Sequence, residues 1–187
     1  MVRPRPAAGL LAALLAAAAV AVPQPGEEHA AAPTEYQVKA AFLYSFAKFV
    51  QWPADAFADP RDPFVIGVLG EDPFGRILDE TLAGKTVLDR PIRVRRYGTA
   101  EEAALAQIVF VGASEEPERQ RILKALRGRA VLSTGDGEGF AQSGGIVGFT
   151  TRDKRVRFEI NLARADEARL KISSQLLKLA TIVSPRS

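Results

Sequence analysis

The sequence has no cysteine, one histidine and one tryptophan among its 187 residues. The absence of cysteine excludes disulfides, thiolate nucleophiles and zinc sites with cysteine ligands. The single histidine, His29, lies in an aperiodic segment rich in Pro, Gly and Ala, which offers no rigid frame for a catalytic base. We therefore expect a protein that is not an enzyme and that carries no cofactor and no metal ion.

A large excess of charge of one sign is also missing. The chain has 25 basic and 22 acidic residues, and two of the basic ones, Arg3 and Arg5, lie in an N-terminal leader. Without that leader, 23 basic residues stand against 22 acidic ones. Binding to nucleic acid needs a clustered surplus of positive charge that neutralises phosphates, so no nucleic-acid partner is expected.

Long hydrophobic runs are limited to residues 7–22, and this run is shorter than the roughly 20 residues that span a bilayer. It follows two arginines and ends with Ala19 and Ala21 at the spacing of a signal-peptidase site. We expect residues 1–21 to be a secretory signal peptide, with a retained membrane anchor as the alternative. Residues 22–34 then form a flexible linker, and the exported protein is expected outside the cytoplasm with no direct membrane insertion.

The folded part is predicted to begin with a helix over residues 36–50. Thr34 and Gln37 have the spacing of a capping box, and Pro53 ends the segment. The helix is apolar nearly all round, and its polar residues expected to face water are Gln37, Lys39, Tyr44 and Lys48. Its aromatic side chains, with Phe49 and Trp52 at the end, either fill the core or form a surface that pairs with another chain.

The next hundred residues alternate short apolar runs with helical segments. Strands are predicted over residues 64–69, 92–96, 108–111 and 130–133, and helices over residues 72–82, 100–105 and 117–126. Residues 146–150 and 155–162 flank a turn and predict an antiparallel hairpin, and residues 166–182 predict a helical tail. The sequence thus predicts one three-layer α/β domain over residues 35–183, in which a largely parallel sheet ends in an antiparallel hairpin and a C-terminal helix.

Several short motifs resemble known sites but lack their required context. Gly84, Lys85 and Thr86 match the end of a phosphate-binding loop, yet they precede a strand and not a helix. The glycines of residues 135–139 have the wrong spacing for a dinucleotide loop, and Asp136 and Glu138 supply too few oxygen ligands for calcium. These segments are interpreted as turns and strand exits.

Specific strings of the sequence carry more information than these motifs. EYQVKAAFLYSFAKFVQWP (35–53), FVIGVLGEDPFG (64–75), IVFVGASE (108–115) and VRFEINLARADEARLKISSQLLKLATIV (156–183) resemble the YfiR family of periplasmic proteins, as do RPIRVRR (90–96) and GFAQSGGIVGF (139–149). The resemblance implies a regulator without enzymatic activity that binds the periplasmic sensor of an inner-membrane signalling protein, typically a diguanylate cyclase. Relatives commonly carry a cysteine before the IVFV strand, where this chain has Ala106 and Gln107.

Two places are candidates for binding the partner. Trp52 and Phe49 end the aromatic helix, and tryptophan is a frequent interface anchor. In VRFEINL, strand alternation places Arg157, Glu159 and Asn161 on one polar face. Glu159 either pairs with a neighbouring cation on the protein surface or presents its charge to the partner.

Two other functions remain open from the sequence. A small-ligand receptor serving a histidine kinase or receptor system would use the loops 70–73, 112–115 and 134–139, although no ligand-binding residue is assigned. A carboxylate hydrolase would need two of Asp72, Glu115 and Asp136 to face one cleft. A homodimer is a further possibility that the sequence does not decide.

Overall fold

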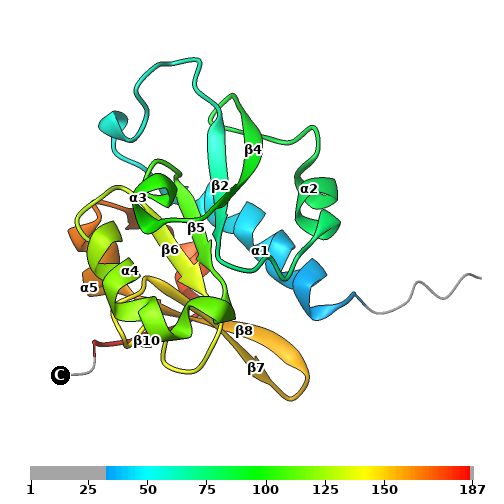
Figure 1. The fold of residues 1–187 in the computed structure, drawn as a ribbon, viewed down its shortest axis with the longest axis vertical. Helices are drawn as coiled ribbons and strands as arrows, with labels where there is room; N and C mark the ends of the chain where they lie inside the picture. The colour runs from blue at the N-terminus through cyan, green and yellow to red at the C-terminus, as the bar shows by residue number, and fades with distance from the viewer. Residues whose placement is uncertain (1–32, 186–187) are drawn as a thin grey trace, which may run out of the picture. The chain divides into compact units, whose positions relative to one another are not determined.

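The computed structural model describes residues 33–185, which fold around an eight-stranded sheet (Figure 1). From one edge to the other, the strands are β10 (Thr181–Val183), β8 (Arg155–Asn161), β7 (Val147–Arg152), β6 (Leu132–Gly135), β5 (Ile108–Val111), β2 (Phe64–Leu69), β4 (Arg90–Tyr97) and β3 (Thr86–Val87). Two further short strands, β1 (Val50–Gln51) and β9 (Lys171–Ile172), pair with each other outside this sheet.

The centre of the sheet is parallel, as the continuous apolar runs predicted. Strand β2 pairs in parallel with both β4 and β5, and the parallel ladder continues through β6 to β7. Strands β7 and β8 form the expected antiparallel hairpin. Every residue of β2 and β5 is buried, because helices cover both faces of these strands.

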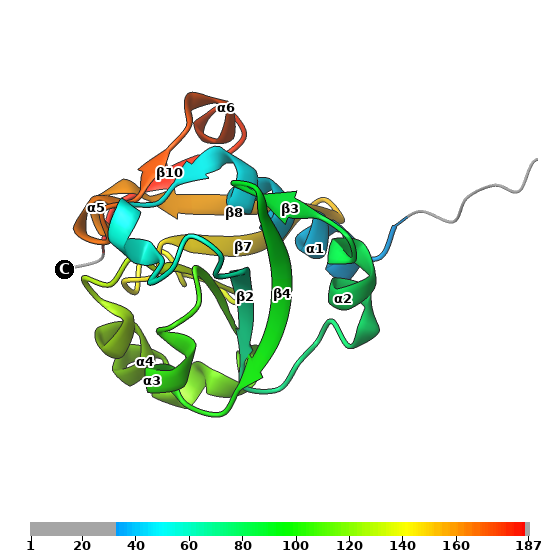
Figure 2. The ribbon, with the colours of Figure 1, turned by 90° about the horizontal axis from the view of Figure 1, so that it is seen from above.

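Helices lie on both sides of the sheet and enclose two separate cores (Figures 1 and 2). On one side, α1 (Glu35–Phe49) packs beside α2 (Arg76–Leu82), and its Phe46 contacts Phe149 and Phe158 of the hairpin. On the other side lie α3 (Ala100–Ala103) and α4 (Arg119–Leu126), which is preceded by the 3₁₀ helix η2 (Ala113–Glu118). This arrangement confirms the three-layer α/β prediction.

The glycines after β6 serve packing. A Cβ atom at Gly135 or Gly145 would overlap the ring of Phe140, which is buried in the second core. The absence of a side chain at both positions lets the loop fold over this ring. Of the glycines that resemble a nucleotide loop, Gly135 thus has a steric explanation, while Gly137 and Gly139 have positive φ values, which glycine adopts most readily.

The predicted helical tail over residues 166–182 is wrong in its extent. A short helix α5 (Leu162–Glu167) begins earlier, because the side chain of Asn161 caps it, and it ends before Arg169, whose φ is 57°. The chain then forms β9, the short helix α6 (Ser174–Leu177) and finally β10. Thr181–Val183 pair in parallel with β8 and add an edge strand to the sheet.

No helix within residues 33–185 has the length and apolar character needed to cross a membrane. The expected signal peptide, nearly all of the expected linker and His29 lie outside the described residues.

Candidate functional site

A groove of about 900 Å³ lies where β5 and β6 end, next to the first turn of α1 and the β7–β8 hairpin. Its walls come from six places in the chain, which the fold brings together. They include Glu35, Tyr36 and Lys39 of α1, Asp136 and Glu138 after β6, Phe149 to Arg152, Arg157 to Glu159, and Lys178 to Thr181. In open α/β sheets, the edge at which parallel strands end is the usual place for binding.

Lys39 is the charged centre of this groove. Its exposed fraction is 3%, so the sequence interpretation that placed it on the water-facing side of α1 is wrong. The Nζ atom lies 2.7 Å from Oδ1 of Asp136 and 2.5 Å from Oε1 of Glu35, and 4.5 Å from the ring centre of Tyr36. Since a buried ammonium is costly without compensation, the two carboxylates and the ring make its position tolerable.

Asp136 also binds Tyr36. The Tyr36 hydroxyl donates a hydrogen bond of 3.1 Å to Oδ2 of Asp136, and its ring packs edge-on against Phe74. Burial raises the pKa of Tyr36 to about 12, and the negative charge of Asp136 and the hydrogen bond add to this shift. One carboxylate therefore ties the loop after β6 to the first turn of α1. The contacts of Asp136 with Lys39 and Tyr36 therefore stabilise the fold itself.

Glu159 also lies on the groove wall, but its contacts differ from those of Asp136. It is half-buried, and its Oε2 atom is buried without a hydrogen-bond partner. Among the described residues it takes part in no ion pair, although Arg157, two positions away, is exposed on the same strand. Oδ1 of Asp136 likewise has no hydrogen-bond partner, but it is ion-paired with Lys39, whereas Oε2 of Glu159 has neither kind of partner among the described residues.

Asn161 does not reach the surface, although strand alternation placed it with Arg157 and Glu159. Its exposed fraction is 0%. The Nδ2 group donates to the carbonyl of Ala141, and Oδ1 accepts from the backbone N–H of Arg164 at the start of α5. The loop before β7 covers this end of the strand, so Asn161 fixes the junction between β8 and α5.

Trp52 and Phe49 lie away from the groove walls. The Trp52 ring is half-buried and packs edge-on against Phe64 at 4.9 Å between ring centres. Its Nε1–H donates to the backbone carbonyl of Gln107 at 3.3 Å. Phe49 is half-buried against the larger core, and its carbonyl accepts from the N–H of Ser173. The five candidate residues therefore do not form one site.

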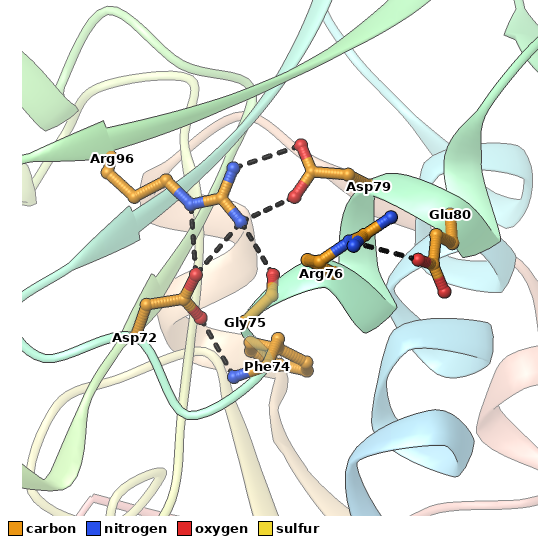
Figure 3. A network of polar contacts seen from close by, with 7 residues as sticks. All are labelled: Asp72, Phe74, Gly75, Arg76, Asp79, Glu80 and Arg96. Carbon is orange, nitrogen blue, oxygen red and sulfur yellow. Dashed lines mark hydrogen bonds and ion pairs between the residues drawn. The ribbon is translucent and has the colours of Figure 1, made fainter.

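The carboxylates considered for hydrolysis have separate partners. Asp72 caps the N–H of Phe74 and pairs with Arg96 of β4, which also binds Asp79 and the carbonyl of Gly75 (Figure 3). Glu115 is half-buried and accepts a hydrogen bond from Ser114. Neither Asp72 nor Glu115 lines the groove that contains Asp136. Within residues 33–185, no three acidic or histidine side chains gather in a way that could hold a metal ion.

The Arg96 network predicts a measurable pH dependence of stability. Hydrogen bonding to Arg96 holds the pKa of Asp79 below its usual range. A lowered folded-state pKa stabilises the protein above the ordinary carboxylate range, and this stabilisation is lost as the pH falls through the folded-state pKa. We expect Arg96→Met to reduce the free energy of unfolding at neutral pH by up to about 1 kcal/mol, since both side chains are partly exposed.

Urea unfolding between neutral pH and pH values below about 4 tests this expectation. The difference between Arg96→Met and the wild type should shrink as the pH falls. Arg93→Met is the matched control, because it removes the same side chain from the same strand but no described ion pair. Equal pH dependence in both variants would contradict the assignment.

Comparison with known families adds a result that the geometry alone does not give. A family model described as YfiR/HmsC-like matches residues 36–181, which includes nearly the whole described fold. No curated protein matches the chain.

Proposed function

Since the chain belongs to the YfiR/HmsC-like family, we propose that it represses an inner-membrane signalling protein by binding the periplasmic sensor of that protein. Family membership indicates a periplasmic regulator of cyclic-di-GMP signalling, in a family that is regulatory and not known as enzymatic. The partner in this proposal is of the diguanylate cyclase type, and bound repressor holds it inactive. Export through the N-terminal leader would place the two proteins in the same compartment.

The unsatisfied carboxylate of Glu159 is the observation that supports this proposal most directly. A buried acceptor without a donor costs free energy, which a lysine, an arginine or an N–H group of a partner would recover on binding. The rigid strand β8 holds Glu159 in place, and Arg157 adds an exposed charge beside it. Asn161 contributes to this surface indirectly, because it fixes the end of the same strand.

Trp52 and Phe49 form the second part of the proposed contact. Both side chains are half-buried, so each presents part of its ring while the rest is held by the core. An aromatic ring that is already immobilised loses little conformational freedom when a partner covers it. These two residues are proposed as apolar anchors, apart from the charged contact at Glu159.

The charge reversal Glu159→Lys tests the proposal in cells. We expect this variant to fold, because the affected oxygen has no internal partner to lose, and to raise cyclic-di-GMP through release of the partner. A like charge in place of a complementary one should weaken binding about tenfold or more. The measurements are the cyclic-di-GMP content of cells that carry the variant and its melting temperature in purified form.

Glu101→Lys is the matched control, since Glu101 is exposed on α3 and the same charge change occurs away from the groove. Cells with Glu101→Lys should keep the wild-type cyclic-di-GMP level. If a well-folded Glu159→Lys protein represses as the wild type does, the charged part of the proposed interface is refuted.

The size of the groove favours a second candidate function, that of a small-ligand receptor for a histidine kinase or receptor system. Its volume of about 900 Å³ falls within the range of small-molecule sites. Thermal-shift screening of periplasmic metabolites separates the two functions. A ligand that raises the melting temperature of the wild type but not of Glu159→Lys would favour this second function.

A further inference from the structure

The four arginines of β4 divide into two pairs by strand alternation. Arg96 points toward α2 and binds Asp72, Asp79 and Gly75. Arg90 shares that parity and donates to the carbonyls of Asp59 and Asp62. The odd-numbered pair, Arg93 and Arg95, points to the opposite face of the sheet, where both side chains are exposed. Neither takes part in an ion pair among residues 33–185.

The same strand has an open backbone edge. Strand β3 covers only the beginning of β4, and the last contact on that side is the N–H of Ile92, which donates to the carbonyl of Lys85. Backbone groups alternate in direction along a strand, so those of Val94 and Arg96 point to the same side as those of Ile92. Within the described residues, no strand pairs with β4 there beyond β3.

A hollow of about 730 Å³ lies on the face of the sheet toward which Arg95 points. Its apolar walls include Tyr97 and Leu105, and Leu105 is 74% exposed. The hollow has three acidic residues. Asp55 pairs with Arg169 and Asp62 accepts from the N–H of Asp59, so Glu102 is the one whose carboxylate has no such contact among the described residues. An exposed leucine in the same hollow as Arg95, which has no ion-pair partner among the described residues, is a combination typical of interaction surfaces.

We propose that the open edge of β4 binds an extended acidic segment of a partner protein, which adds to the sheet as a further strand. Val94 and Arg96 supply the backbone hydrogen bonds, as in other cases of strand addition. Arg93 and Arg95 are two positions apart on one face, so they match acidic residues at alternate positions of the incoming strand. This surface is separate from the groove and does not depend on the repressor role proposed above.

Charged edge strands also protect proteins against aggregation, and the two roles predict different results. The test uses the ¹⁵N-labelled protein, residues 22–187, and a capped peptide Thr-Glu-Val-Glu-Thr at millimolar concentrations. Strand addition predicts shifts of the Val94 and Arg96 amide signals, and these shifts should weaken at high salt. An edge that is only protected would show no saturable shifts, and this result would overturn the proposal.

Three comparisons define the contact. The Arg93→Glu/Arg95→Glu variant should lose affinity for the acidic peptide by about tenfold or more and should bind Thr-Lys-Val-Lys-Thr instead. Lys154→Glu/Arg155→Glu changes the charge equally at the exposed hairpin turn and should bind as the wild type does. A peptide with methylated backbone nitrogens at alternate positions should fail to bind. Unchanged binding by the β4 variant, or by the methylated peptide, would contradict strand addition. Arg93→Gln/Arg95→Gln repeats the test if the reversed variant does not fold.

Discussion

Replacement of Trp52 by alanine is expected to lower the free energy of unfolding by about 3 kcal/mol, at the lower end of the range for a deleted core aromatic. The side chain is half-buried, packs edge-on against Phe64 and donates to the carbonyl of Gln107. Alanine loses the ring contact, leaves a cavity beside Phe64 and removes the donor from that carbonyl. Urea unfolding of the purified protein measures the change.

Trp52→Phe separates the two contributions, because it keeps an aromatic ring against Phe64 but has no N–H donor. This variant should lose roughly 1 kcal/mol, close to the usual contribution of one hydrogen bond. If Trp52→Ala left stability unchanged, the packing interpretation would be wrong and the tryptophan would serve only a partner. Partner binding is best measured with Trp52→Phe, since that protein remains well folded.

Asp136→Asn is expected to lower the free energy of unfolding by about 2 kcal/mol. Removing one member of a buried ion pair leaves the other charge uncompensated and typically costs more, but Glu35 still faces Lys39 from a partly exposed position. The double variant Lys39→Met/Asp136→Asn should recover much of this loss, because no buried charge is left unpaired and Glu35, which loses Lys39, is exposed. Glu138→Gln is the control, since it removes a carboxylate from an exposed position in the same loop.

The Asp136→Asn variant should also change the titration of Tyr36. The pKa of this tyrosine is raised to about 12, first by burial and then by Asp136. Asp136→Asn removes the second cause and keeps the first, so the pKa should fall but stay above the ordinary tyrosine value of about 10. Phenolate absorbance measures it, and Tyr36→Phe identifies the signal.

The sign of the linked stability change follows from this shift. A raised folded-state pKa stabilises the protein below the ordinary tyrosine pKa, and the stabilisation is lost as the pH rises toward about 12. The pH range over which this stabilisation is lost should therefore be narrower in Asp136→Asn than in the wild type. An unchanged Tyr36 titration in that variant would refute the contact between these two side chains.

The parts of the fold that follow from local sequence were predicted well. Thr34 and Gln37 form the expected capping box, and the apolar runs at residues 64–69 and 108–111 are the expected buried parallel strands. The prediction of a helical tail failed because the strands of this segment pair with partners far away in the chain. Thr181–Val183 has three residues, too few for periodicity to distinguish a strand from a helix, and its strand character depends on β8.

The candidate site was predicted only in part, for the same physical reason. Arg157 and Glu159 reach the groove as strand alternation indicates, but Asn161 is covered by a loop that alternation does not take into account. Lys39 was assigned to water because it is charged. In the structure Lys39 pairs with Asp136, which is 97 positions further along the chain, and no local sequence pattern encodes that contact. A lysine within a helix that is apolar nearly all round was the one available signal.

Gln107 lies directly before β5 and connects this strand to both β2 and the segment that follows α1. Its side chain accepts from the N–H of Val65 at 2.8 Å and donates to the carbonyl of Ala56, and its own backbone N–H donates to the carbonyl of Val65. The amide proton of Val65 is therefore held by a side chain and not by the backbone of a neighbouring strand. Substitution of this one glutamine would free the N–H of Val65 and the carbonyl of Ala56, while the ladder between β2 and β5 would remain.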